Sequence, residues 1–176
     1  MALIFLDLET TGLDPVRDMI LEVAALRVDV NTFEPVDGFQ ALISPQKSGV
    51  TMPQPDEYVT AMHTANGLFA EIAAGGGYAY GEVHSGLKAW LEKQGTEKHT
   101  LAGNSIHFDL GFLKVEMPAV AALFSHRLFD VSAFRVAREL RCLPPCEIVG
   151  AMQHRAAADV TASVAVARWH LSRVVS

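Results

Sequence analysis

The 176-residue sequence predicts an α/β fold in which helices cover a mixed β-sheet. Three strand-like segments come first, and helical and strand-like segments then alternate to the end of the chain. Half of the residues are hydrophobic and 19% are charged, which supplies a sizeable core and excludes a disordered chain. We find no internal repeat and no long linker, so we expect one domain over residues 1–176.

The first dozen residues predict a buried strand that ends in two acids. Residues 3–6 are continuously apolar, as in a strand covered on both faces. Asp7 and Glu9 are two positions apart, so in a strand they project to the same side. Two adjacent anions repel each other and resist burial, and a divalent cation with oxygen ligands would compensate them. The alternative is a strand that simply runs into solvent.

The next segments complete the first half of the sheet and its first helix. Gly, Asp and Pro mark a turn at residues 12–15, and prolines mark a surface loop later on. A glycine run at 75–77 ends the first predicted helix. In order, the elements are a strand over 19–30, a strand over 33–43 with turns or a hairpin near 34–35 and 37–38, a surface loop over 44–55, and a helix over 56–72.

Helices dominate the second half of the chain. An amphipathic helix is followed by short strands and helices, and the chain is broken by two adjacent prolines. In order, we expect a helix over 82–94, a strand over 100–104, a helix over 106–116 that ends before Pro118, a strand over 127–130, a helix over 131–141, a break at 143–145, and a helix over 156–174.

The charge and the cysteines exclude several classes of protein. The net charge is −6, which argues against a broad basic surface for duplex but allows a short nucleic acid or one whose phosphates meet metal ions. Cys142 and Cys146 are too few for a disulfide framework and lack a second pair for zinc, so we expect free thiols. No apolar run approaches a membrane span of about 18 residues, and no secretion signal opens the chain. We therefore expect a cytoplasmic protein without a membrane partner.

Two later segments add acids that point to the same chemistry. Asp109 lies in the helix that follows a short strand, and His154 stands five residues before Asp159. Residues five apart on a helix diverge by about 140°, so His154 belongs to the preceding loop and Asp159 to the inner face of the last helix. Burial of Asp159 among alanines would be costly without a partner. Taken singly, Asp109 or Asp159 is better explained as a helix N-terminal acid or a satisfied surface residue.

Together, the four carboxylates and one histidine are the parts of a two-metal phosphodiester hydrolase. In such sites the ions lie about 3.5–4 Å apart and stabilise the attacking and leaving oxygens. A histidine with an ordinary pKa of about 6.5 is suited to take the proton of the attacking water at neutral pH.

This pattern resembles the DEDD exonucleases of the histidine type, which share an RNase H-like fold. The pattern consists of Asp7-x-Glu9, Asp109 and His154-x-x-x-x-Asp159. Nearly the whole chain further resembles the oligoribonuclease family, through residues 7–15, Ala102-Gly-Asn-Ser-Ile, Met117-Pro, Arg127-x-x-Asp-Val-Ser132 and His154-Arg-Ala. The resemblance implies a three-layer fold with a mixed five-stranded sheet flanked by helices. It also implies a homodimer that uses two divalent ions, Mg²⁺ or Mn²⁺, to hydrolyse short RNA, especially dinucleotides, to mononucleotides from the 3′ end.

The resemblance also assigns roles to individual residues. Asp7, Glu9, Asp109 and Asp159 would hold the metal ions, and His154 would be the general base. Residues that would contact the substrate are Leu13 as a wedge between bases, Tyr58 as a stacking surface, and His63, Ser105, Arg127 and Ser132 around the 5′ phosphate. Each of these six also has an ordinary structural explanation, such as a rim charge or a helix cap.

The sequence departs from the family pattern at several positions. Tyr58 replaces a tryptophan, Thr10 a methionine, and His126 a tyrosine that reaches the partner subunit; Leu110 and Gly111 replace arginines, and residues 75–77 interrupt a helix. These changes affect substrate length and dimer detail rather than the metal ligands.

Two alternatives remain open. A DEDD exonuclease that trims or proofreads longer single strands would need an open basic groove with stacking aromatics. A binding protein that retains the fold without catalysis would lack a ligand, whereas all five catalytic positions are filled here.

Overall fold

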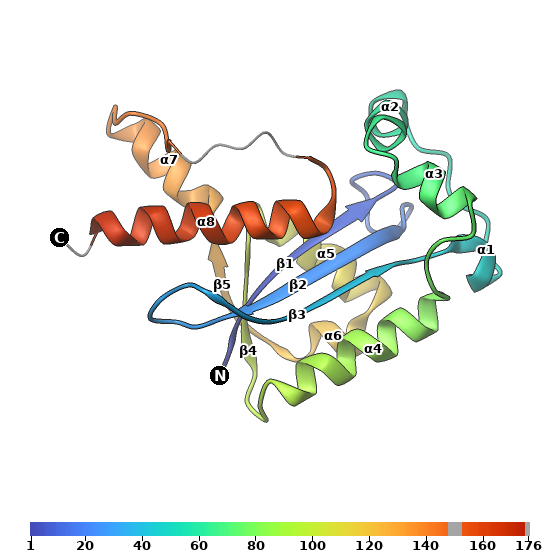
Figure 1. Ribbon diagram of the computed structural model, residues 1–176, viewed down its shortest axis with the longest axis horizontal. Helices are drawn as coiled ribbons and strands as arrows, with labels where there is room; N and C mark the ends of the chain where they lie inside the picture. Colours follow the sequence, from blue (N-terminus) through green and yellow to red (C-terminus); the bar gives the residue numbers. More distant parts are fainter. Residues whose placement is uncertain (148–152, 175–176) are drawn as a thin grey trace.

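A computed structural model describes residues 1–147 and 153–174, and it shows a mixed five-stranded sheet within this part of the chain (Figure 1). The strands are β1 (Leu3–Thr10), β2 (Ile20–Val28), β3 (Pro35–Leu42), β4 (His99–Gly103) and β5 (Phe124–Asp130). Their order is β3-β2-β1-β4-β5, with β1, β2 and β3 antiparallel and β4 and β5 parallel to β1. The predicted α/β class and mixed sheet are confirmed.

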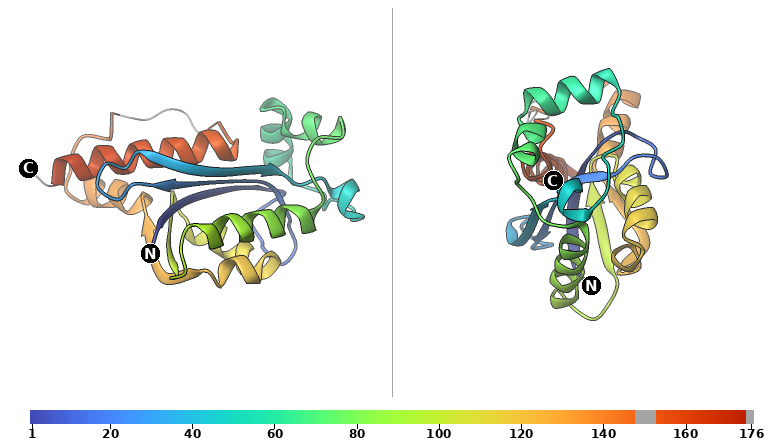
Figure 2. Two further views of the ribbon diagram at one scale, coloured as in Figure 1. Left: turned by 60° about the horizontal axis from the view of Figure 1, so that its bottom comes forward. Right: turned by 90° about the vertical axis from the view of Figure 1, so that its right-hand side faces the viewer.

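Helices lie on both faces of the sheet and give three layers (Figure 2). The helices are α1 (Pro45–Ser48), α2 (Glu57–Ala65), α3 (Leu68–Ala73), α4 (Tyr80–Lys93), α5 (His107–Glu116), α6 (Pro118–Ala121), α7 (Ser132–Leu140) and α8 (Ala156–Val174). Helix α8 crosses one face, whereas α4, α5 and α6 cover the other. Helices α2 and α3 stand beyond the end of the sheet at which β1 finishes.

Successive side chains of β1 point to opposite faces of the sheet and therefore pack into different helical layers. Ile4 and Leu6 are buried in the core formed with α4, α5 and α6, whereas Phe5 is buried in the core formed with α8. Successive side chains of a strand point to opposite faces, so Asp7 and Glu9 continue on the side of Phe5. The two acids therefore lie beneath the beginning of α8.

The prediction of one helix over residues 56–72 is wrong, because the chain breaks into α2 and α3. Gly67 has a φ of 81°, in the left-handed region where glycine is favoured. The Asn66 side-chain oxygen accepts a hydrogen bond over 3.0 Å from the amide of Leu68, the first residue of α3. Helical spacing of apolar residues continued through the break and concealed it.

Other boundaries differ in smaller ways. The loop predicted over 44–55 contains the short helix α1, and α6 was not predicted. Asp37 and Gly38 do not form a turn but lie within β3; the hairpin instead turns at 29–33, where the Phe33 amide donates to the Asp29 carbonyl over 2.8 Å. Strand β5 begins at Phe124, three residues earlier than predicted. Within the described residues, no helix is long and apolar enough to cross a membrane, and both cysteines are free.

Candidate active site

The end of β1 and the beginning of α8 bring together a buried group of possible metal ligands. One ligand atom each from Glu9, His154 and Asp159 lies within 4.8 Å of the other two. Glu9 is 6% exposed and Asp159 2% exposed. His154 precedes α8 and Asp159 lies in its first turn, so the prediction that separated them into loop and helix is confirmed.

Asp7 and Asp109 extend this group at the end of the central strand β1. Burial, and then the negative charges of Asp109 and Glu9, raise the pKa of Asp7 well above its ordinary value. Burial raises the pKa of Asp109 to about 7. Burial, and then the charge of Asp159, raise the pKa of Glu9 to about 8. We call Asp7, Glu9, Asp109, His154 and Asp159 the acidic cluster.

The acidic cluster fits a divalent cation. Glu9, Asp109 and Asp159 are buried and Asp7 is partly buried. The pKa values of Asp7, Glu9 and Asp109 are raised, so these three hold protons more tightly than an ordinary carboxylate does. The carboxylate oxygens form a donor set that suits Mg²⁺ or Mn²⁺. A cation among them would reverse the electrostatic cost of their burial.

Backbone hydrogen bonds fix the orientation of two members of the cluster. The Asp109 Oδ1 accepts from the Leu8 amide over 2.9 Å, which ties the first turn of α5 to β1. The Asp159 carboxylate accepts from the amides of Gln153 and His154, each over 2.9 Å. One carboxylate oxygen of Asp109 and both carboxylate oxygens of Asp159 thus accept backbone hydrogen bonds, and the Asp159 carboxylate also holds the loop that carries His154.

His154 itself has a strained backbone that its neighbours hold in place. Its φ is 51°, which is uncommon for a residue with a side chain. Its amide donates to Asp159, and its carbonyl accepts from the side-chain amide of Asn66, in the break between α2 and α3. The break that sequence reasoning missed therefore supports the proposed general base.

The structure does not support the expected contact of His63 with a 5′ phosphate. The His63 side chain is fully buried. Its Nε2 lies 3.0 Å from the Thr10 carbonyl oxygen and 3.9 Å from Glu9 Oε2, and its Nδ1 lies 3.4 Å from the side-chain nitrogen of Asn66. Burial lowers its pKa and favours the neutral ring. His63 thus joins β1 to the break between α2 and α3.

Ser105 and Ser132 lie together around Asp130, at the ends of β4 and β5. The Asp130 Oδ1 accepts from the Ser105 amide over 3.0 Å, from the Ser132 amide over 2.9 Å and from the Ser132 hydroxyl over 2.7 Å. Arg127 lies on β5 three residues before Asp130, and its side chain is exposed. Within the described chain, no hydrogen bond connects Arg127 to Ser105 or Ser132. The two serines are brought together, whereas Arg127 is not placed beside them.

The residues expected to contact bases have exposed side chains. Leu13 is 76% exposed on the loop after β1, and Tyr58 is 69% exposed on α2. Sequence reasoning missed a further pair directly before Asp109. The rings of His107 and Phe108 are 4.3 Å apart, and Phe108 is 50% exposed. The sequence signal for this pair is two adjacent aromatic residues directly before a motif acid, which indicates a surface for base stacking.

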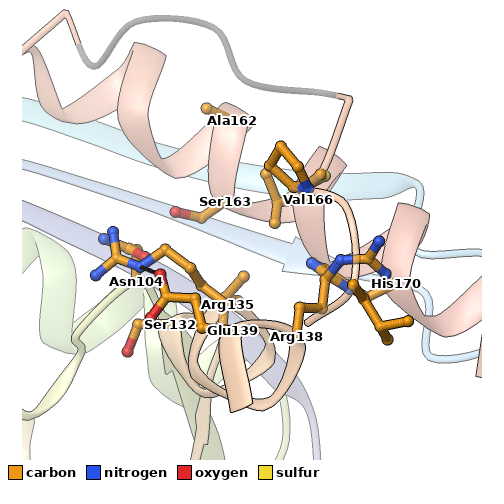
Figure 3. A pocket seen from close by; sticks show the side chains of 13 residues that line it. Asn104, Ser132, Arg135, Arg138, Glu139, Ala162, Ser163, Val166 and His170 are labelled. Carbon is orange, nitrogen blue, oxygen red and sulfur yellow. Dashed lines mark ion pairs between the residues drawn. The ribbon is translucent and has the colours of Figure 1, made fainter. Parts of the chain in front are cut away.

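A separate pocket of about 370 Å³ lies between α7 and α8 (Figure 3). Asn104 and Ser132 line it, but no member of the acidic cluster does. Its arginines already have partners, since the Arg138 Nε donates to the Pro144 carbonyl over 2.7 Å and the Arg135 Nε lies 3.8 Å from Glu139 Oε1. The pocket adjoins Ser132 and is separate from the acidic cluster.

Comparisons with known proteins show what the chain is similar to. Residues 4–167 match a family described as Exonuclease. The chain is 34% identical over 168 residues to an oligoribonuclease of Tropheryma whipplei (strain Twist), covering 93% of this chain and 88% of that one. It is 35% identical to an oligoribonuclease of Streptomyces avermitilis, covering 96% and 84%.

Solved structures confirm the RNase H-like exonuclease fold. Exonuclease I of Escherichia coli, in a zinc-bound complex with single-stranded DNA, superposes with a TM-score of 0.75 at 18% identity. Exonuclease I of Methylocaldum szegediense superposes with a TM-score of 0.73 at 21% identity. Each match covers 98% of this chain but only 40% of the other, so the chain spans less than half the length of these enzymes.

Proposed function

The chain belongs to the oligoribonuclease family of exonucleases, and from this premise we propose that it is a metal-dependent 3′→5′ exoribonuclease. Its substrates are short oligoribonucleotides, especially dinucleotides, which it hydrolyses to 5′-mononucleotides. The observation that supports this most strongly is the convergence of Glu9, His154 and Asp159 within 4.8 Å, beside Asp7 and Asp109.

Asp7, Glu9, Asp109 and Asp159 would hold two divalent ions, Mg²⁺ or Mn²⁺. Bound cations would neutralise the phosphodiester oxygens and lower the pKa of an attacking water. Backbone amides donate to one carboxylate oxygen of Asp109 and to both of Asp159, which limits how the two carboxylates can turn toward a ligand. The protein would thereby supply oxygen donors whose directions are fixed before the metal ions and the substrate bind.

His154 would accept the proton of the attacking water. Its imidazole lies among the carboxylates, and its backbone is held from both sides by Asp159 and Asn66. A general base contributes typically 10²–10⁴-fold to the rate when it is within hydrogen-bond reach of the proton.

Substrate binding would use the exposed groups around the cluster. Leu13, Tyr58 and Phe108 offer apolar or aromatic faces for bases. Ser105, Ser132 and Arg127 would contact the 5′ phosphate and so limit the length of the substrate. Arg127 would reach the phosphate through its long side chain. His63 would act behind the site, through Thr10 and Asn66.

The reaction is tested with a 5′-labelled trinucleotide and Mg²⁺ or Mn²⁺. We expect a labelled dinucleotide to appear before the labelled mononucleotide, because nucleotides leave from the 3′ end. His154→Ala should lower kcat by about 10²-fold or more, whereas His84→Ala, in the helical layer on the other face, should not. Absence of hydrolysis with both ions by the folded protein would refute the proposal.

Substrate length is tested separately, by comparing kcat/KM for a dinucleotide and a seven-nucleotide RNA. A clear preference for the dinucleotide supports a site closed around the 5′ phosphate, and Arg127→Ala should weaken binding of the 5′-phosphorylated form more than that of the unphosphorylated form. Equal efficiency on both lengths would instead favour the alternative enzyme that trims longer strands.

We further propose that the protein is a homodimer that acts in the cytoplasm. Free cysteines suit a reducing compartment. Strand β5 is at the edge of the sheet and exposes His126, Arg127 and Leu128, so a second subunit has an edge to cover.

A further inference from the structure

A second buried glutamate lies directly opposite Glu9. In the antiparallel pairing of β1 with β2, Glu9 faces Glu22. Directly opposed residues of an antiparallel pair place their side chains on the same face, and like charges at such positions are destabilising. Glu22 is 0% exposed, so water does not screen it. Its negative charge is among the causes that raise the pKa of Asp7 and of Glu9.

Arg155 compensates Glu22 with a two-pronged ion pair. The Arg155 Nε and Nη2 donate to the two carboxylate oxygens of Glu22, each over 3.1 Å. The same Nη2 donates to Glu71 over 2.9 Å. The Ala156 amide donates to Glu22 over 3.0 Å, and the side-chain amide of Gln40 lies 3.3 Å from its other oxygen. The Glu22 carboxylate is thus fully occupied by donors.

The position of Arg155 links this ion pair to the active site. Arg155 directly follows His154, and its carbonyl accepts the amide of Asp159 over 3.0 Å. The Ala156 amide, which also binds Glu22, begins α8. The beginning of α8 is therefore attached to β2 at the residue that faces Glu9.

We propose that Arg155 and Glu22 form a positioning pair, which fixes His154 and Asp159 beside Glu9 and keeps the Glu22 carboxylate away from the metal ions. This role deepens the proposed function and rests on it. Neither residue touches the substrate; both act through the loop that precedes α8. Without Arg155, Glu22 would be a buried anion with no cationic partner next to the acidic cluster.

The experiment is a double-mutant cycle with Glu22→Gln, Arg155→Gln and the double variant. Its control is Arg168→Gln, which removes an ion pair with Glu34 on the exposed side of α8. Three quantities are measured for each: kcat and KM for a 5′-phosphorylated dinucleotide, the Kd for Mn²⁺ by calorimetry without substrate, and the Tm in EDTA.

We expect Arg155→Gln to lower kcat about tenfold or more with little change in KM, to weaken Mn²⁺ binding several-fold, and to lower the Tm. The double variant should recover part of each loss, because two amides can hydrogen-bond without leaving a buried charge unpaired. Arg155→Lys should give values of kcat, Mn²⁺ affinity and Tm between those of Arg155→Gln and the unaltered protein, since lysine keeps the charge but cannot make the two-pronged contact. Arg168→Gln should resemble the unaltered protein.

Two results would overturn the positioning pair. One is an Arg155→Gln variant whose kcat and Mn²⁺ affinity match those of Arg168→Gln. The other is a double variant that recovers neither Mn²⁺ affinity nor Tm relative to Arg155→Gln. If the unaltered protein hydrolyses no dinucleotide, the proposed reaction fails, but Mn²⁺ binding and Tm still decide whether the pair orders the acidic cluster.

Discussion

Without a metal ion, the folded protein stabilises the ionised form of individual carboxylates in the acidic cluster poorly. Glu9 is 6% exposed and Asp109 9%, and the pKa of each is raised, to about 8 and about 7. A carboxylate that is hard to ionise is a poor contribution to stability but a good ligand once a cation is present. Function and stability therefore oppose each other at these residues.

Glu9→Gln tests this opposition directly. We expect the metal-free protein to gain stability near pH 8, because the amide removes one of several mutually repelling charges, while kcat falls by orders of magnitude with the loss of a metal ligand. Thermal melts in EDTA and the dinucleotide assay measure the two effects. Glu97→Gln is the matched control, since Glu97 is exposed and pairs with the N-terminal amine. A lower Tm for Glu9→Gln than for Glu97→Gln at pH 8 would contradict the prediction.

The stability of the metal-free protein should fall as the pH rises from about 4 to about 8. In this interval the unfolded chain has ionised Glu9 and Asp109 near their ordinary values of 4.5 and 3.8, whereas the folded protein still holds their protons. Each such group lowers the free energy of unfolding by up to about 1.4 kcal/mol per pH unit.

Mg²⁺ should oppose this fall, because metal binding requires the deprotonated ligands and strengthens with pH. Melts across the pH range, in EDTA and in Mg²⁺, measure both trends. Asp109→Asn should flatten the EDTA curve. A metal-free protein that becomes more stable between pH 5 and 8 would contradict the assignment.

At the scale of elements, the site depends on where one helix ends and another begins. The break between α2 and α3 places Asn66 so that its side chain contacts His63, the Leu68 amide and the carbonyl of His154. A continuous helix would leave the loop before α8 without this support. The break thus supports the loop that carries His154, although no residue within the break belongs to the acidic cluster.

Asn66→Ala should show this dependence. We expect kcat to fall about tenfold and the free energy of unfolding to fall by about 1–3 kcal/mol, because buried partners lose their hydrogen bonds. Steady-state kinetics and urea unfolding measure the two quantities. Asn31→Ala, in the exposed turn between β2 and β3, is the control. If Asn66→Ala retains the kcat of Asn31→Ala, the break does not support His154.

At the scale of the whole molecule, strand order places the acids in the middle of the sheet and leaves β5 at its edge. Central β1 is covered by both helical layers, whereas β5 has one unpaired side. An exposed edge strand is a surface on which a second copy can pair or pack.

We therefore expect light scattering to give twice the chain mass of 19.1 kDa at micromolar concentration. Leu128→Asp, on β5, should weaken the dimer, because it would bury a charge at the interface. Val36→Asp, on the opposite edge strand β3, is the matched control. A protein that is monomeric at these concentrations, or a dimer that Leu128→Asp leaves intact, would contradict this arrangement.

The sequence alone determined the α/β class, the strand with Asp7 and Glu9, and the placement of His154 in a loop before Asp159. These follow from local periodicity, because a strand alternates every two residues and a helix repeats every 3.6. It could not determine the break at Asn66–Gly67, the burial of His63, or the ion pair between Glu22 and Arg155, 133 residues apart. Those features depend on which distant segments pack together, and only the tertiary structure decides which buried charges meet a partner.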